Sequence, residues 1–152
     1  MKLISHRGNI NGPNPAEENS PHNIELALSK GYDVEIDLRS IDNKLFLGHD
    51  GPQYLIDISF LKKENLWIHC KNIEALKFCK DERITNNYFW HQNDDVTITS
   101  NNFFWTYPGK TLTNHSIAVM PEIENFSDID SCYGICSDYV ESYFYRLKTF
   151  KK

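Results

Sequence analysis

The chain has 152 residues, 40% of them hydrophobic and 24% charged, which fits one globular domain over residues 1–152 and excludes a disordered chain. Its formal net charge of -5 argues against nucleic-acid binding through a broad basic surface, so an anionic ligand would need local positive charge or a metal. No run reaches the roughly 18 apolar residues of a membrane span, and the first residues lack the apolar stretch of a secretory signal. We therefore expect a cytoplasmic protein with reduced cysteines and no bound nucleic acid. The sequence does not indicate an oligomeric state.

Eight short apolar runs, each ending in polar residues, predict eight strands. They cover residues 2–5, 32–38, 66–70, 87–91, 96–99, 103–107, 116–120 and 133–137. Their hydrophobicity is continuous rather than alternating, which is typical of strands covered on both faces in a parallel sheet. Helical patterns lie between the early strands, at residues 22–30, 56–63 and 73–80, and we expect a closing amphipathic helix over residues 139–152.

This alternation of strand and helix predicts right-handed βαβ units. Eight such strands indicate an α/β fold of the (β/α)₈ TIM-barrel type, for which about 250 residues is typical. The gaps between residues 86 and 120 are too short for full helices. We therefore expect a compact barrel in which several crossover helices are shortened or missing.

Two carboxylates, Glu35 and Asp37, lie two residues apart in the second predicted strand. The two-residue period of a strand puts both on one face, which in a barrel is the interior. Two buried carboxylates repel each other unless they bind a cation or pair with a base, and a hard divalent ion is the natural partner. The alternative is that both acids lie at the solvated end of the strand and pair with Arg7, Arg39 or Lys71.

His69 and Lys71 repeat this spacing at the C-terminal end of a later strand, where barrel active sites form. His69 can complete a metal site, and Lys71 can neutralise a phosphoryl oxygen. His6 and His49 lie at strand-to-loop junctions and flank the acidic pair in the sequence. Because the pKa of imidazole is near neutrality, two histidines can divide the duties of general base and general acid.

Taken in chain order, these residues and their neighbours resemble the signature of the glycerophosphodiester phosphodiesterase family. The family pattern is His-Arg-Gly, then Pro-Glu-Asn-Thr/Ser, Glu-x-Asp and His-Asp. Within residues 4–51 the chain has His6-Arg7-Gly8, Glu18-Asn19-Ser20, Glu35-Ile36-Asp37 and His49-Asp50. Residues 133–139 are similar to the family's last-strand pattern, which ends in Thr-Asp-x-Pro.

The resemblance implies a metal-dependent barrel enzyme. It assigns roles to six residues: Glu35 and Asp37 as metal ligands, His6 and His49 as catalytic residues, and Arg7 and Lys71 as phosphate contacts. The chain departs from the family at its Glu-x-Lys motif, where the Glu is a further metal ligand and this chain has His69-Cys70-Lys71. Either His69 binds the metal, which we expect to be Mg²⁺ with Mn²⁺ or Ca²⁺ as alternatives, or His69 contacts the substrate and Glu122 supplies the missing carboxylate.

His91 and Trp105 lie at the ends of predicted strands. They either line a pocket for a polyol, sugar or nucleoside group or fill the core. The sequence thus predicts a metal-dependent phosphodiesterase whose partner is a small phosphodiester, glycerophosphodiester-like or linked to a polyol or sugar. Two alternatives stay open: lyase-type cleavage that gives a cyclic phosphate, and a catalytically silent module that binds a phosphorylated polyol or glycan.

Overall fold

The computed structural model describes residues 1–149, which contain ten short strands and four short helices. The strands are β1 (Lys2–His6), β2 (Asp33–Ile41), β3 (Lys44–Leu47), β4 (Tyr54–Ile56), β5 (Leu66–Cys70), β6 (Asn87–Phe89), β7 (Val96–Ile98), β8 (Phe104–Thr106), β9 (Ser116–Val119) and β10 (Gly134–Ser137). The helices are α1 (Pro21–Ser29), α2 (Ile58–Leu61), α3 (Ile73–Asp81) and α4 (Val140–Thr149), with a 3₁₀ turn, η1 (Ile129–Ser131). The last three residues of the closing helix predicted over 139–152 lie outside the described residues.

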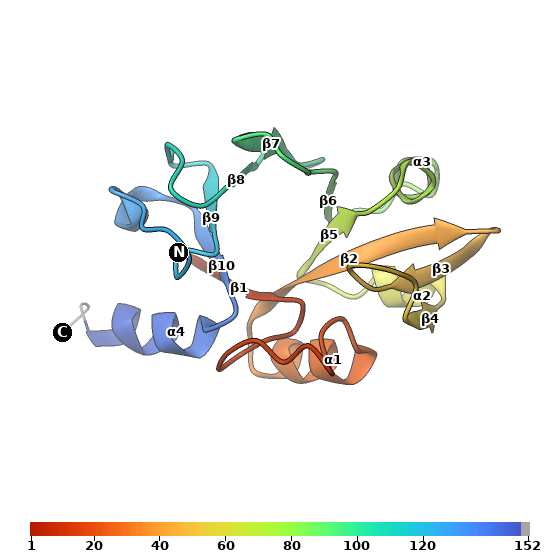
Figure 1. The fold of residues 1–152 in the computed structure, drawn as a ribbon, viewed down its shortest axis with the longest axis horizontal. Helices are drawn as coiled ribbons and strands as arrows, with labels where there is room; N and C mark the ends of the chain where they lie inside the picture. Colours follow the sequence, from red (N-terminus) through yellow and green to blue (C-terminus); the bar gives the residue numbers. More distant parts are fainter. Residues whose placement is uncertain (150–152) are drawn as a thin grey trace.

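All ten strands belong to one mixed sheet that curls into a half-barrel (Figure 1). Seven of them, in the order β6-β5-β2-β1-β10-β9-β8, run parallel. β3 pairs with the second half of β2 in antiparallel fashion, β4 extends the sheet beyond β3, and β7 lies antiparallel to β8. The (β/α)₈ TIM-type barrel expected from the sequence is therefore wrong.

The physical reason lies in the connections between strands. A parallel pair needs a crossover of a dozen or so residues, which α1 provides between β1 and β2 and α3 between β5 and β6. From β6 to β9 the chain has no helix, and β7 turns back as the first strand of a hairpin. Within residues 1–149, β6 and β7 do not pair with each other; the N–H of Ser100 instead donates to the carbonyl of Tyr88 at 2.9 Å.

The local predictions were more accurate than the global one. All eight predicted strands are present with small differences at their ends, whereas β3 and β4 were missed. The helix expected over residues 22–30 is α1, which begins at Pro21 after Ser20, whose hydroxyl accepts a hydrogen bond from the N–H of Asn23 at 3.2 Å.

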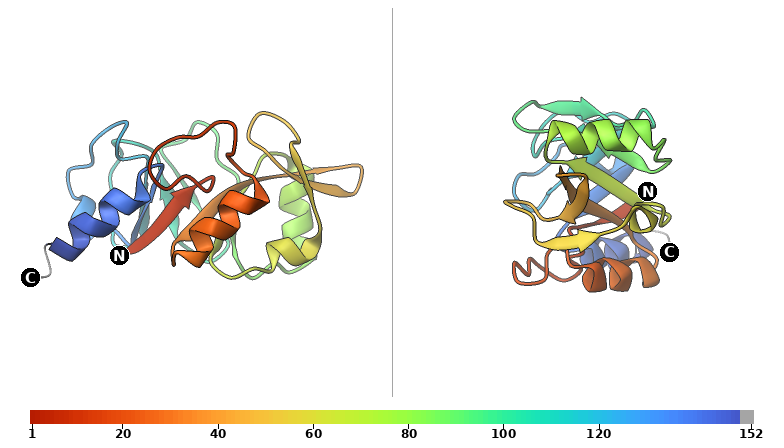
Figure 2. Two further views of the ribbon diagram at one scale, coloured as in Figure 1. Left: turned by 90° about the horizontal axis from the view of Figure 1, so that it is seen from below. Right: turned by 90° about the vertical axis from the view of Figure 1, so that its right-hand side faces the viewer.

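Apolar side chains fill both sides of the sheet. The helices α1, α2 and α3 bury the outer side of β2 and β5, and Figure 2 shows α4 beside α1 along this exterior. An ion pair of 3.6 Å between Lys30 and Glu141 joins these two helices. On the inner side Trp67, Phe89 and Trp105 pack together, with 4.5 Å between the ring centroids of Phe89 and Trp105. This aromatic layer forms an apolar floor inside the curl.

Two expectations about the chain's environment can be compared with the structure. None of the helices within residues 1–149 has the length and apolar character needed to cross a membrane. The four cysteines are free and buried in the structure.

Candidate functional site

The predicted site residues lie together on the inner face of the sheet, at the C-terminal ends of the parallel strands. Every second residue faces the inside of the curl, so that Trp67 in the floor is followed by His69 two residues later. The register between neighbouring strands aligns His6 with Glu35 and Asp37 with His69. Residues that are far apart in the sequence therefore meet above the aromatic floor.

Glu35, Asp37 and His69 form a cluster with the spacing of a metal site, because each offers one ligand atom and these atoms lie within 4.8 Å of one another. Nδ1 of His69 is 3.6 Å from Oε1 of Glu35 and 3.5 Å from Oδ1 of Asp37. Its Nε2 lies 2.8 Å from the carbonyl oxygen of His91, which can only accept, so we assign the ring proton to Nε2. A neutral His69 then turns the lone pair of Nδ1 toward two carboxylates.

Asp37 is the most enclosed member of the cluster, with no exposed surface. Asn19 holds it by two hydrogen bonds: the side-chain oxygen accepts from the N–H of Asp37 at 2.8 Å, and the amide donates to Oδ2 at 2.9 Å. Nζ of Lys71 lies 3.5 Å from Oδ1. Burial alone would raise the pKa of Asp37, but the positive charges of Arg7 and Lys71 outweigh it and hold that pKa well below its usual range. Asp37 is therefore an anion at neutral pH.

Arg7 connects the acidic cluster to two further side chains. Its backbone has a φ of 53°, supported by a hydrogen bond of 2.9 Å from the N–H of Asn19 to its carbonyl. Nη1 donates to Glu18 at 3.0 Å, and Nη2 lies 2.7 Å from Nδ1 of His49. Nε lies 3.0 Å from Oδ2 of Asp37, but its N–H makes no hydrogen bond, so we count this contact as an ion pair only.

The ring orientation of His49 follows from the contacts of Nδ1. Because an arginine only donates, the 2.7 Å contact with Arg7 assigns a lone pair to Nδ1 and the proton of the neutral ring to Nε2. The 3.3 Å contacts between Nδ1 and both oxygens of Asp37 would need a proton on Nδ1. In a neutral ring Nδ1 cannot both accept from Arg7 and donate to Asp37. Because the contact with Arg7 is the shorter one, we place the ring proton on Nε2.

The loop that carries His49 is fixed by Gly48 and Arg39. Gly48 has a φ of +145°, and a Cβ atom there would lie 2.1 Å from the carbonyl oxygen of Gly51, so a larger residue does not fit. Arg39 donates to the carbonyl oxygens of both Gly48 and His49. The position of the imidazole therefore depends on a loop with little freedom.

His6 is held by a carboxylate from the last strand. Its Nδ1 lies 2.8 Å from Oδ1 of Asp138, and its Nε2 lies 4.0 Å from Oε2 of Glu35. Burial lowers the pKa of His6, but the hydrogen bond to Asp138 and the charge of Glu35 outweigh it, so the pKa is raised. Burial likewise raises the pKa of Asp138, and the bond from His6 more than offsets it, so that pKa is lowered. Asp138 thus fixes one proton on Nδ1 and leaves Nε2 for proton transfer.

These side chains surround a cavity of about 790 Å³. Four carboxylates lie in or directly beneath it, against two fixed positive charges: Glu18, Glu35, Asp37 and Asp138 against Arg7 and Lys71. With neutral histidines the site therefore has a formal excess of two negative charges. An anionic ligand is therefore repelled unless a cation or the protonation of a histidine compensates for this excess.

The structure brings together nine of the ten site residues proposed from the sequence. Eight line the cavity, and Asp37 lies buried against them: the eight are His6, Arg7, Glu35, His49, His69, Lys71, His91 and Trp105. Glu122 is the exception, since it is exposed and lies outside the metal-type cluster. Its Oε1 accepts hydrogen bonds from the hydroxyl of Ser137 at 3.0 Å and the N–H of Asp138 at 2.9 Å, so it anchors the residue that holds His6.

Sequence reasoning assigned no role to Asn9, Glu18, Asn19 or Asp138. The amide of Asn9 bridges Glu18 and Asp138 at 3.0 and 2.8 Å, and Asn19 holds Asp37 as described above. A signal was present for Glu18, Asn19 and Asp138, because all three stand in segments that resemble the family pattern. Nothing in the sequence around Asn9 indicated its position.

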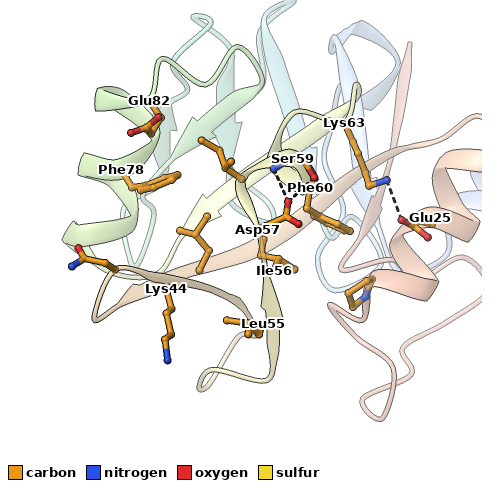
Figure 3. A pocket seen from close by; sticks show the side chains of 14 residues that line it. Glu25, Lys44, Leu55, Ile56, Asp57, Ser59, Phe60, Lys63, Phe78 and Glu82 are labelled. Atoms are coloured by element: carbon orange, nitrogen blue, oxygen red, sulfur yellow. Dashed lines mark hydrogen bonds and ion pairs between the residues drawn. The ribbon is translucent and has the colours of Figure 1, made fainter.

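A second cavity, of about 830 Å³, lies outside the sheet between β3, β4, α2 and the neighbouring parts of α1 and α3 (Figure 3). Its described lining residues include no histidine, and half of them are apolar, with Leu55 and Phe60 among these. Three of its charged groups are already engaged, because Lys63 binds Glu25 at 3.0 Å and Asp57 accepts a hydrogen bond from the first turn of α2. Among the residues that the structure describes, this cavity lacks the imidazoles and the metal-type cluster of the first.

The cavity at the strand ends thus combines a cluster of divalent-cation type with two imidazoles and two fixed positive charges. The functional conclusion therefore rests on these residues and their geometry. No protein-family model, no curated protein and no solved structure matches the chain.

Proposed function

We propose that this chain is a metal-dependent phosphodiesterase that cleaves a small phosphodiester by acid–base catalysis. The observation that carries the proposal is Nδ1 of His69, which faces Glu35 and Asp37 at 3.6 and 3.5 Å while its second nitrogen is already bound. A lone pair that faces two carboxylates is repelled by them, and a cation between the three groups removes the repulsion.

The donor set fits a divalent cation. Two carboxylate oxygens and one imidazole nitrogen lie within 4.8 Å of one another, in a site with an excess of negative charge. We expect Mg²⁺, with Mn²⁺ as the ion that the imidazole ligand favours. Once bound, such an ion polarises a phosphoryl oxygen and stabilises the negative charge that develops in the transition state. Protonation of His69 is the competing explanation of the geometry, and a metal titration separates the two.

Arg7 and Lys71 supply positive charge for the other phosphate oxygens. Both line the cavity, and both lie against Asp37, at 3.0 and 3.5 Å. The bonds from Arg7 to Glu18 and His49 hold the guanidinium in place before a substrate arrives. Charge-assisted hydrogen bonds from these two residues would orient the diester between the two imidazoles.

His6 and His49 divide the proton transfers. Asp138 holds the Nδ1 proton of His6, so Nε2 can accept the proton of the attacking hydroxyl, which is a neighbouring substrate alcohol or a water. His49 has the more exposed side chain, 38% against 14% for His6, and its Nε2 lies on the side of exposed Asp50 at 3.8 Å. We assign the protonation of the leaving alkoxide to His49 in its imidazolium form, in which Nδ1 would donate to Asp37 instead of accepting from Arg7.

The test is an assay of the purified chain on glycerophosphodiesters and on diesters linked to polyols and sugars, with Mg²⁺, Mn²⁺ or Ca²⁺. We expect turnover that EDTA abolishes and added metal restores. Turnover that is indifferent to EDTA, or no turnover on any diester, would contradict the proposal, and binding without turnover would favour a silent binding module. Phosphorus NMR separates a hydrolysed monoester from the cyclic phosphate of a lyase. The small-molecule partner and the cytoplasmic location belong to the same proposal.

A further inference from the structure

The cavity has two chemically different halves. One half consists of charged and imidazole side chains from β1, β2 and β5 and from the loops after β1, β3, β5 and β10. The opposite half is largely apolar and comes from the ends of β8 and β9 and their loops: Trp105, Tyr107, Pro108, Val119, Met120 and Ile123. Because a phosphate requires only the charged half, the apolar half is available to an alcohol group of the diester.

Tyr107 forms a rigid part of this apolar half. Its ring packs against that of His91 in a tilted arrangement, with 3.8 Å between the ring centroids and an interplanar angle of 38°, and its hydroxyl donates to the carbonyl of Gln92. Its backbone N–H donates to the carbonyl of Asp95 at 2.9 Å. An aromatic ring that is already fixed loses little conformational freedom when a ligand packs on it, so the contact contributes most of its energy to binding.

Polar groups lie beside this wall, and an isoleucine lies at its outer edge. Gln92 and Asn93 line the cavity and are exposed, and among the residues that the structure describes their side-chain amides have no hydrogen-bond partner. Ile123 also lines the cavity although 69% of its surface is exposed. A ligand that covers Ile123 removes apolar surface from water. The wall therefore offers an apolar surface with hydrogen-bonding groups along one edge.

We propose, on the basis of the phosphodiesterase function above, that this half of the cavity recognises a ring on the substrate alcohol. The ring would pack its apolar face on Tyr107 and Ile123 and present its polar edge to the amides of Gln92 and Asn93. A hexose and a nucleoside share this chemistry, whereas glycerol has no extended apolar face. The substrate class is thus a phosphodiester of a cyclic alcohol rather than of an acyclic polyol.

Calorimetric binding measurements test this inference without any need for turnover. In the presence of Mg²⁺, the chain is titrated with a hexose 6-phosphate, a nucleoside 5′-monophosphate and glycerol 3-phosphate. We expect at least one ring compound to bind about tenfold more tightly than glycerol 3-phosphate, and Tyr107→Ala and Ile123→Ala each to remove most of that advantage. Ile98→Ala is the matched control, because Ile98 is similarly exposed at 59% but lies on β7 outside the cavity. The preferred compound identifies the ring as sugar or nucleoside.

The outcomes separate this inference from the proposed function. Equal affinity for all three compounds, no binding of any of them, or a ring preference that survives both Tyr107→Ala and Ile123→Ala overturns the ring subsite. A ring preference lost in both variants supports the subsite even if no diester is cleaved, which would contradict the phosphodiesterase function alone. Cleavage of diesters without any ring preference contradicts the subsite alone.

Discussion

The two walls of the cavity come from regions of the chain that are built differently. Residues 1–81 contain β1, β2 and β5, with α1, α2 and α3 packed on the outer side of β2 and β5. They supply the acidic cluster, both proposed catalytic histidines and the positive side chains of Arg7 and Lys71. Residues 87–123 contain β6 to β9, joined without helices, and they supply the aromatic and apolar wall. The charged groups thus lie where helices cover the sheet, and the wall proposed for substrate recognition lies where short loops join the strands.

This difference has a physical basis. A buried carboxylate such as Asp37 is tolerated only if its hydrogen-bond partners and counter-charges are held in place, and the strands of the first region are fixed by a core on their outer side. A wall that binds through packing needs less precise positioning. We therefore expect substitutions in the first region to abolish chemistry and those in the second to change affinity.

The largest expected effect is the loss of either proposed catalytic histidine. His6→Ala or His49→Ala should lower turnover by about 10²- to 10⁴-fold, the range of general acid–base catalysis, while metal binding and folding persist. His115→Ala is the control, because His115 is exposed and lies outside the cavity. Steady-state kinetics and circular dichroism check this prediction, and near-normal turnover in both variants would refute the assignment.

A smaller effect on turnover is expected from a substitution at Gly48, in the loop before His49. Gly48→Ala should lower the free energy of unfolding by about 1–3 kcal/mol, because it forces a strained backbone and a clash with the carbonyl of Gly51. Turnover should fall because His49 is displaced. Gly51→Ala is a control in the same loop, since a Cβ atom there meets nothing within 4 Å. Urea unfolding would contradict this view if both variants had the same stability.

The smallest effect concerns the pair formed by His6 and Asp138. The lowered pKa of Asp138 gives a stabilisation that is present above its ordinary value and lost as the pH falls through the folded-state value. The raised pKa of His6 gives a stabilisation that is present below its ordinary value of 6.5 and lost as the pH rises through the folded-state value. Asp138→Asn should therefore lower the free energy of unfolding by about 1 kcal/mol or more between roughly pH 4 and 6.5, and by less on either side. A difference that is constant from pH 4 to pH 9 would contradict the pairing.

The first region was also the more predictable from sequence. The apolar runs identified its parallel strands, and the strand period placed Glu35 and Asp37 on one face, as the structure shows. The sequence did contain a sign of the missed β3, because Asp42 and Asn43 are residues that favour the tight turn of a hairpin. In the structure they adopt φ values of 49° and 60°. The pairing of β3 with β2 was then within reach of the sequence.

Other features required the three-dimensional arrangement. The sequence counts strands but does not give their directions, so the antiparallel β7 and the open edge beside it were read as parts of a barrel. Glu122 follows a strand as a ligand would, yet in the structure it accepts a hydrogen bond from the hydroxyl of Ser137 in β10. The hydrogen bond that assigns the His69 proton is accepted by the backbone carbonyl of His91, and a backbone acceptor cannot be predicted from the pattern of side chains in the sequence.

The central claim is that Glu35, Asp37 and His69 hold a divalent cation, and a calorimetric titration with Mn²⁺ tests it most directly. Asp33→Asn is the matched control, because Asp33 lies at the other end of β2, where it binds Lys2 at 3.0 Å. We predict that the wild type and Asp33→Asn bind one Mn²⁺ per chain and that Glu35→Gln and His69→Ala bind it more than about tenfold more weakly. A wild-type chain that binds no Mn²⁺, or variants that bind it as tightly as the wild type, would contradict the account.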